Sequence, residues 1–260
     1  MYKPGPFDFV PLWLMVAVTL IAVYGAVESG YRLGERRRRN AEHEAEAPVG
    51  AIVGATLGLL AFMLAFTFSL AASRFEDRRQ VVLDEANAIG TTYLRAGMLA
   101  EPHRGEIRKL LREYVEMRIR AIQDGNIDEG LKMSNEYHER IWAAAEAVVK
   151  EDRSPIAASF VVSLNEVIDL HASRIQAGLR SRIPLVIWLA LAFVTMVAML
   201  AMGYQMGLAS KKRSAASLSL VLTFSAVLLL IADLDRPGEG LLEVGQQATI
   251  DLLDSMKDAN

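Results

Sequence analysis

The sequence contains no cysteine. Disulfide frameworks, thiolate metal sites, iron–sulfur clusters and cysteine nucleophiles are therefore excluded. The chain also lacks a Walker A loop, a GxGxxG or GxSxG turn, and an HExxH pair, which carry much of the known enzyme chemistry. We therefore predict that the protein is not an enzyme, with no catalytic residue, no cofactor and no metal-binding site.

Charge is missing from four long stretches, although 23% of the residues are charged. The charge-free stretches are 9–27, 47–73, 183–210 and 214–232. Each is long enough for the roughly 20 apolar residues that cross about 30 Å of hydrocarbon as a helix. The sequence therefore predicts a four-span membrane protein whose first partner is the lipid bilayer. It excludes a soluble enzyme, a nucleic-acid-binding module and a disordered chain.

The charged residues divide the chain into four regions. Residues 1–72 hold the first two spans and an arginine-rich loop over 28–48. Residues 73–182 form a polar middle domain, residues 183–232 hold the third and fourth spans, and residues 233–260 form an acidic tail. Strand-like alternation is missing, so the predicted fold is all-α.

Two junctions between these regions have no strong break. The second span enters polar sequence without Gly or Pro, which predicts one long helix reaching about residue 99. The last helix of the middle domain is expected to run into the third span near Pro184.

The arginines and lysines near the spans suggest an orientation. Loops 28–48 and 207–214 hold eight Lys and Arg between them, including the run Arg36 to Arg39. Short loops rich in these residues stay in the cytoplasm. Charge density therefore predicts that the middle domain lies outside the cytoplasm; the family resemblance described below implies that the membrane is the bacterial inner (cytoplasmic) membrane.

Small residues recur along the second span. Gly50, Gly54 and Gly58 are spaced by four and share a helix face, and Phe62 and Phe66 follow one turn apart. Small residues on one face let another helix approach closely, and a ring of Phe can close a pore by dewetting. We leave two interpretations open: packing within the chain, or an oligomer interface or pore-lining face.

Polar residues on the two helices next to the membrane predict a shared network. Glu85 lies 13 residues beyond the second span and Asp169 lies 14 residues before the third, so both stand roughly 20 Å from the bilayer. Buried polar groups must pair, and His171 or Arg174 is expected to balance the acidic charge. We favour structural pairing over ion binding or pH sensing. The predicted members are Arg74, Glu85, Asn87, Asn165, Glu166, Asp169, His171 and Arg174.

Four further charged residues stand near the ends of spans two and four: Arg78, Arg79, Asp235 and Arg236. One interpretation is a charge cluster at a pore mouth. The other is anchoring at the membrane surface, with a helix stop before Pro237.

Four sequence blocks resemble those of a known family. Residues 74–79 (RFEDRR), 84–91 (DEANAIGT), 164–171 (LNEVIDLH) and 233–237 (DLDRP) are similar to the bacterial bestrophin-like domain proteins, a family of unknown function. The resemblance implies kinship with bestrophins, which are pentameric anion channels with four spans and a cytosolic helical domain between the second and third. That orientation is opposite to the one predicted from charge density.

Two functions are compatible with these features. We predict an oligomeric bestrophin-like anion channel, with small ions as ligands and a homo-oligomer that the resemblance suggests is a pentamer. The alternative is a membrane-embedded sensor or scaffold whose partner protein binds the arginine-rich loop 28–48. No nucleic acid is expected as a partner.

Overall fold

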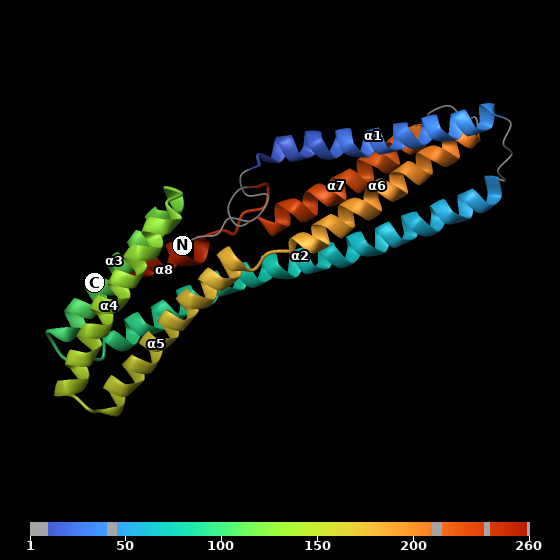
Figure 1. The fold of residues 1–260 in the computed structure, drawn as a ribbon. Coiled ribbons are helices and arrows are strands. Elements are labelled where there is room, and N and C mark those ends of the chain that lie inside the picture. Colours follow the sequence, from blue (N-terminus) through green and yellow to red (C-terminus); the bar gives the residue numbers. More distant parts are fainter. Residues whose placement is uncertain (1–9, 41–45, 210–214, 237–239, 259–260) are drawn as a thin grey trace. The chain divides into compact units, whose positions relative to one another are not determined.

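Helices account for all regular structure in residues 10–40, 46–209, 215–236 and 240–258, which this computed structural model describes (Figure 1). They are α1 (Leu12–Arg39), α2 (Glu46–Ala96), α3 (His103–Gln123), α4 (Ile127–Glu151), α5 (Pro155–Ile175), the π-helical turn η1 (Gln176–Arg180), α6 (Leu185–Leu208), α7 (Ala215–Asp235) and α8 (Gln247–Asp258). Within these described residues, four helices are long and apolar enough to cross a membrane. The predicted four-span, all-α fold is confirmed.

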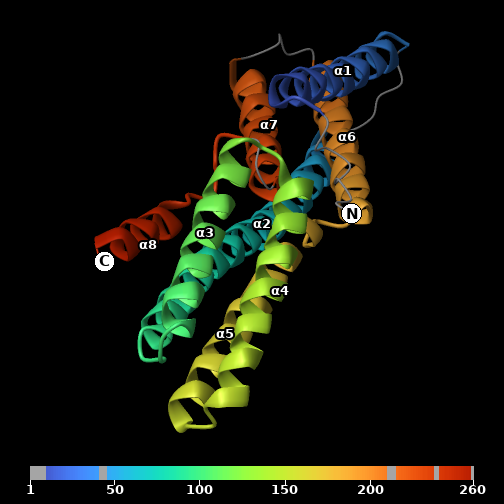
Figure 2. The same ribbon diagram turned by 90° about the vertical axis from the view of Figure 1, so that its left-hand side faces the viewer.

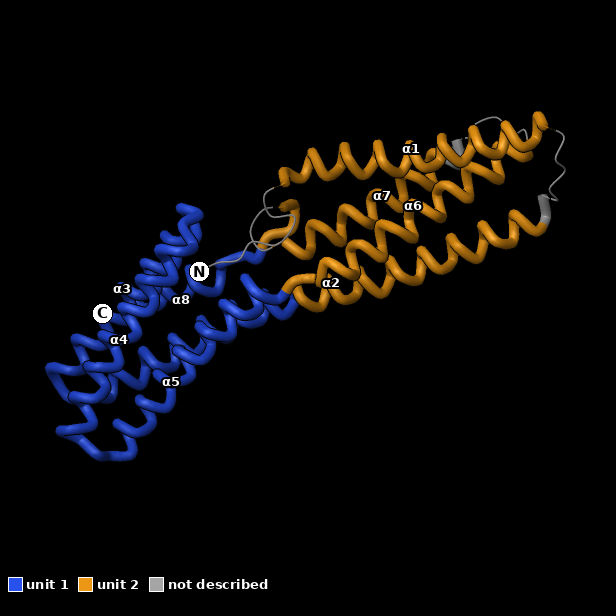
Figure 3. The backbone as a smooth tube through the Cα atoms, in the orientation of Figure 1, with its two compact units in different colours: residues 1–3, 76–181, 244–260 blue, residues 4–75, 182–243 orange. Residues whose placement is uncertain are grey.

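The chain forms two compact units, coloured separately in Figure 3. The membrane unit comprises α1, the first part of α2 up to residue 75, and residues 182–243. The helical unit comprises residues 76–181 and the segment from residue 244 onward. The charge-free part of α2 and Arg74 lie in the membrane unit, and the charged sequence from Glu76 onward lies in the helical unit.

Helix α1 does not end where the charges begin. It continues to Arg39, and α2 starts at Glu46, so the expected loop over 28–48 is wrong. Pairs spaced by four residues support the extra turns: Arg32 contacts Glu28 at 2.8 Å and Arg39 contacts Glu35 at 2.6 Å. Such pairs stabilise a helix surface.

Glycines let α1 and α6 approach each other closely in the membrane unit. A Cβ on Gly30 or Gly34 would overlap the backbone of α6, and a Cβ on Gly203 or Gly207 would overlap the backbone of α1. The contacts follow the same chain direction in both helices: Gly30 lies against Leu200, and Gly34, one turn later on α1, lies against Tyr204, one turn later on α6. The two helices are therefore parallel and packed through reciprocal GxxxG motifs.

The expected continuous helix from the middle domain into the third span is interrupted. α5 ends at Ile175, the turn η1 follows, and α6 begins at Leu185. Pro184 explains the break because it disfavours a helical conformation at the preceding residue and offers no N–H to a helical ladder.

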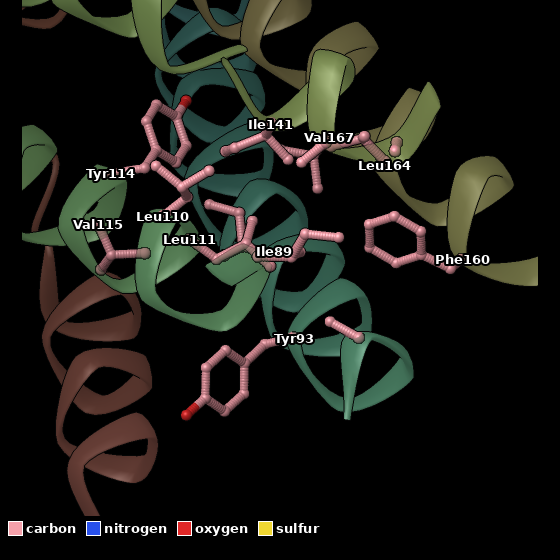
Figure 4. Close-up of a cluster of buried hydrophobic side chains, with 14 of the residues drawn as sticks. Ile89, Tyr93, Leu110, Leu111, Tyr114, Val115, Ile141, Phe160, Leu164 and Val167 are labelled. Atoms are coloured by element: carbon pink, nitrogen blue, oxygen red, sulfur yellow. The ribbon is translucent and has the colours of Figure 1, made fainter. Parts of the chain in front are cut away.

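The core of the helical unit is built by α2, α3, α4 and α5 (Figure 4). Helices α3 and α4 pack side by side as a hairpin, which turns at Gly125 with a positive φ of 67° (Figure 2). α8 also belongs to this core: Met256 is 1% exposed, and the Tyr93 hydroxyl donates to its carbonyl at 3.2 Å. The acidic tail thus contributes a packed helix.

Candidate functional sites

A buried carboxylate lies at the centre of the helical unit. Glu85 is 1% exposed and falls on the α2 face that also buries Val82, Ile89 and Tyr93. A charge taken out of water needs partners of opposite charge and hydrogen-bond donors. The surrounding helices supply both.

Two arginines clamp Glu85. The Nη2 atom of Arg118 on α3 lies 3.1 Å from Oε1 and 3.0 Å from Oε2. Arg174 on α5 donates through Nη1 to Oε2, and its Nη2 donates to the Gln246 side chain at 2.7 Å. Arg174 therefore connects the carboxylate to the segment that leads into α8.

Three ring side chains complete this cluster. The Tyr114 hydroxyl donates to Glu85 Oε1 at 3.4 Å, and His171 Nδ1 lies 3.6 Å from the same oxygen. His138 on α4 packs edge-on against His171, with ring centroids 4.8 Å apart. We call Glu85, Tyr114, Arg118, His138, His171 and Arg174 the buried network. All of its residues lie in the helical unit, outside the charge-free spans.

The charges of the buried network fix its protonation. Burial is the largest influence on the pKa of Glu85 and acts to raise it. The hydrogen bond with His171 and the charges of Arg174 and Arg118 outweigh burial and hold the pKa below its usual range. Burial raises the pKa of Tyr114 and lowers that of His138, the latter to about 4. At neutral pH the network thus places an ionised Glu85 and two guanidinium groups beside a neutral Tyr114 and a neutral His138.

Only part of the predicted polar network is brought together. Glu85, His171 and Arg174 meet as the height argument requires. Asn87, Asn165, Glu166 and Asp169 are instead exposed, and Asn165 donates to Asp169 at 3.0 Å along α5. Arg74 lies in the membrane unit, with Nη1 4.0 Å from Asp235. The expected burial of Asn87 is wrong because its face of α2 points to solvent.

Sequence reasoning missed three members of the buried network. Tyr114 and Arg118 are spaced by four and continue the apolar α3 stripe through Ile107 and Leu111. His138 occupies the buried α4 stripe with Ile141. In each case a charged or polar residue stands at a position of the apolar stripe, and this pattern in the sequence indicates a buried polar side chain.

Asp235 and Arg236 form a second cluster, in the membrane unit. Asp235 is 7% exposed and accepts the Ile183 backbone N–H at 2.9 Å, while Arg182 donates to its carbonyl. Arg236 is 5% exposed and donates to the Val10 carbonyl and to the Met15 sulfur. These side chains hold segments of the unit together, so their expected position at an open pore mouth is wrong.

The other two predicted mouth residues differ from each other. Arg78 is 4% exposed in the helical unit. Arg79 is exposed and lies 3.9 Å from Glu76. Arg79 alone of the four remains on an open surface.

The α2 face that carries the predicted glycines and phenylalanines is open. A Cβ on Gly54 or Gly58 would meet no atom within 4 Å, whereas a Cβ on Gly50 would lie 2.8 Å from the Gln205 side-chain nitrogen. Phe62 is 69% exposed and Phe66 is 65% exposed. Packing within the chain is therefore the wrong interpretation for Gly54 and Gly58.

The exposed centre of this face is made mainly of small residues. At about 100° per residue, its members lie within an arc of about 80°. We call this surface the α2 stripe: Ala51, Ala55, Gly58, Phe62, Ala65, Ser69 and Ser73, all exposed. The other spans expose small residues too, such as Ala22, Ala190 and Ala226, but these lie among large exposed ones such as Trp13 on α1, Val186 and Phe193 on α6, and Leu218 on α7.

Comparisons with known proteins relate most of the chain to one family. The Bestrophin-like domain model matches residues 16–249. No curated protein matches the chain.

Solved structures share the fold. Two point mutants of a bacterial bestrophin homologue from Klebsiella pneumoniae align with TM-scores of 0.68 and 0.66. Both are 14% identical; the alignments cover 95% of this chain and 97% or 98% of theirs. A structure of that homologue solved by zinc phasing gives a TM-score of 0.64 at 14% identity, and the alignment covers 95% of this chain and 97% of the homologue's chain. The likeness extends over both units of the chain.

Proposed function

Because this chain belongs to the Bestrophin-like domain family, we propose that it forms a homo-oligomeric anion channel in which α2 lines the pore. The α2 stripe is the single observation that carries the proposal. Lipid-facing surfaces accept large side chains, and α1, α6 and α7 present them. Small residues instead allow helices of several copies to converge around one axis.

The two phenylalanines suggest where such a pore would be narrowest. Phe62 lies within the α2 stripe and Phe66 lies one turn further on. When copies converge, these rings approach one another and form an apolar constriction that excludes water when closed. The family's bestrophin kinship supports a pentamer.

Arginines provide a preference for anions. Arg79 is exposed six residues beyond Ser73 on the same helix. In an oligomer it would repeat once per copy and raise the local anion concentration. The spans carry no ionisable residue at their centres, so conduction needs no proton relay.

Charge density supports an orientation in the bacterial inner membrane with the helical unit outside the cytoplasm. Arg36 to Arg39 form the last turn of α1, and parallel packing brings that end of α1 beside the end of α6 that precedes Lys211 and Lys212. Positive charge concentrated at one end of the spans favours the cytoplasm for that end. Kinship with bestrophins favours the reverse orientation.

Electrical recording tests the channel proposal. The purified full chain, with its oligomeric state determined by native mass spectrometry, is fused into planar bilayers under a KCl gradient. We expect discrete currents that reverse near the chloride equilibrium potential, from an oligomer. A monomer with flat traces would contradict the proposal and favour the scaffold alternative. A reversal near the potassium potential would leave a channel but reject anion selectivity.

A further inference from the structure

Two buried histidines meet where α4 packs on α5. His138 is 7% exposed and His171 is 4% exposed, and their rings meet at 84°. Within the described chain, neither Nε2 atom has a hydrogen-bond partner. A proton added to the Nε2 atom of His138 would therefore have no acceptor, which makes the charged form of that ring costly.

The groups around His138 provide too little negative charge to balance such a proton. α3 presents Tyr114 and Arg118, α5 presents His171 and Arg174, α2 presents Glu85, and Tyr137 adjoins on α4. Glu85 is the only carboxylate that the described side chains of the buried network contact, and both arginines already engage it. Two guanidinium groups face one carboxylate, so the network already has an excess of positive charge, and a cationic His138 would add to it.

We propose that His138 is an acid-sensitive lock: α4 stays packed on α5 while the imidazole is neutral, and protonation releases α4 from the helical unit. The lock lies within the helical unit and does not depend on ion conduction. It would let the unit respond to acid on whichever side of the membrane it occupies.

The sign of the pH effect follows from the two states. Burial, followed by the charges of His171 and Arg118, lowers the pKa of packed His138 to about 4. A released His138 returns to its ordinary pKa of about 6.5. The released state therefore binds more protons between about pH 6.5 and pH 4, and the packed state loses stability as the pH falls through that window. Glu85 keeps its charge there because its pKa is lowered.

Thiol labelling measures the release directly, because the chain has no native cysteine. Ala145 on α4 is 2% exposed and lies on the same face as His138, two turns later, whereas Ala143 is exposed. The full chain carrying Ala145→Cys or Ala143→Cys is labelled with a maleimide at pH 7.5 and at pH 5. At each pH, the labelling rate of the Ala145→Cys variant is divided by that of the Ala143→Cys variant, which cancels the reagent's own pH dependence. We expect this ratio to rise at least tenfold at pH 5.

Variants assign the effect to His138. In His138→Gln the ratio is expected to change less than twofold between the two pH values, and His138→Phe keeps the ring contact if the glutamine disturbs folding. His103→Gln, which removes the histidine paired with Glu151 at 3.1 Å, should keep the tenfold rise. A flat ratio with His138 intact would overturn the lock, and so would an equal rise in His138→Gln or His138→Phe.

Discussion

At the scale of single residues, the buried network is a balance between desolvation and charge. Glu85 is buried because α2 is packed on this face, and it remains ionised because two guanidinium groups contact it. A buried ion pair adds little net stability compared with apolar residues, but breaking one by removing a single partner is strongly destabilising. The network therefore specifies which faces of α2, α3 and α5 meet.

Neutralising Glu85 tests this balance. Glu85→Gln would leave Arg118 and Arg174 buried without a counter-charge, and we expect the free energy of unfolding to fall by about 3–5 kcal/mol. Thermal unfolding of the detergent-solubilised chain measures the change. Glu166→Gln on exposed α5 surface is the matched control, with an expected effect within about 0.5 kcal/mol. Equal unfolding temperatures for the two variants would contradict the account.

Prediction at this scale succeeded where geometry depended on a helix rise alone. Counting residues from the membrane predicted equal heights for Glu85 and Asp169, and Glu85 does meet α5 in that region, through His171 and Arg174, although Asp169 itself is exposed. Which side of each helix is buried was harder to predict, because the residue pattern of a single helix does not show which neighbouring helix covers which side. Asn87 was assigned to a buried face although it is exposed, and Arg118 on α3 was missed.

At the scale of helices, close packing in the membrane unit depends on glycines that the sequence shows plainly. Gly30 with Gly34 and Gly203 with Gly207 form GxxxG motifs. The sequence pattern did not predict this packing, because Gly30 and Gly34 lie among charged residues in the stretch that was expected to form a loop. The α2 glycines have the same spacing, although a Cβ on Gly54 or Gly58 would meet no atom within 4 Å. Spacing alone does not identify the helix that fills a small-residue face.

Adding side-chain volume distinguishes the two sets of glycines. Gly207→Ala would drive a Cβ into the α1 backbone, and we expect a loss of about 1–3 kcal/mol because backbone cannot move aside cheaply. Gly54→Ala adds the same methyl group where no atom lies within 4 Å, so the folded chain should keep its unfolding temperature. A fluorescence-monitored melt of both variants in detergent makes the comparison. If Gly207→Ala unfolds at the same temperature as the unmodified protein, the account of a close α1–α6 contact is contradicted.

At the scale of the whole molecule, the number of spans and the all-α class could be predicted, because hydrocarbon thickness imposes a length on charge-free helices. The orientation could not be settled in the same way. Similar numbers of Lys and Arg flank both ends of the spans, and only their density differs. Orientation therefore depends on how strongly each cluster is weighted.

Labelling of intact cells determines the orientation. Ala143→Cys puts one thiol on the exposed surface of α4, in a chain with no other cysteine. Charge density predicts that a membrane-impermeant maleimide labels it in whole cells at the rate seen after permeabilisation. Labelling only after permeabilisation would instead establish the cytosolic placement expected from bestrophin kinship.

The central claim is that the α2 stripe lines an ion pathway, and cysteine modification during bilayer recording tests it most directly. Ser69→Cys lies on the stripe, and Val186→Cys lies at a 74% exposed position on α6. A small, positively charged, water-soluble thiol reagent should change the current through Ser69→Cys by more than half, since it alters the charge and width of the pathway. The current through Val186→Cys should stay constant. Equal effects on both variants, no effect on Ser69→Cys, or no current to modify would contradict the account.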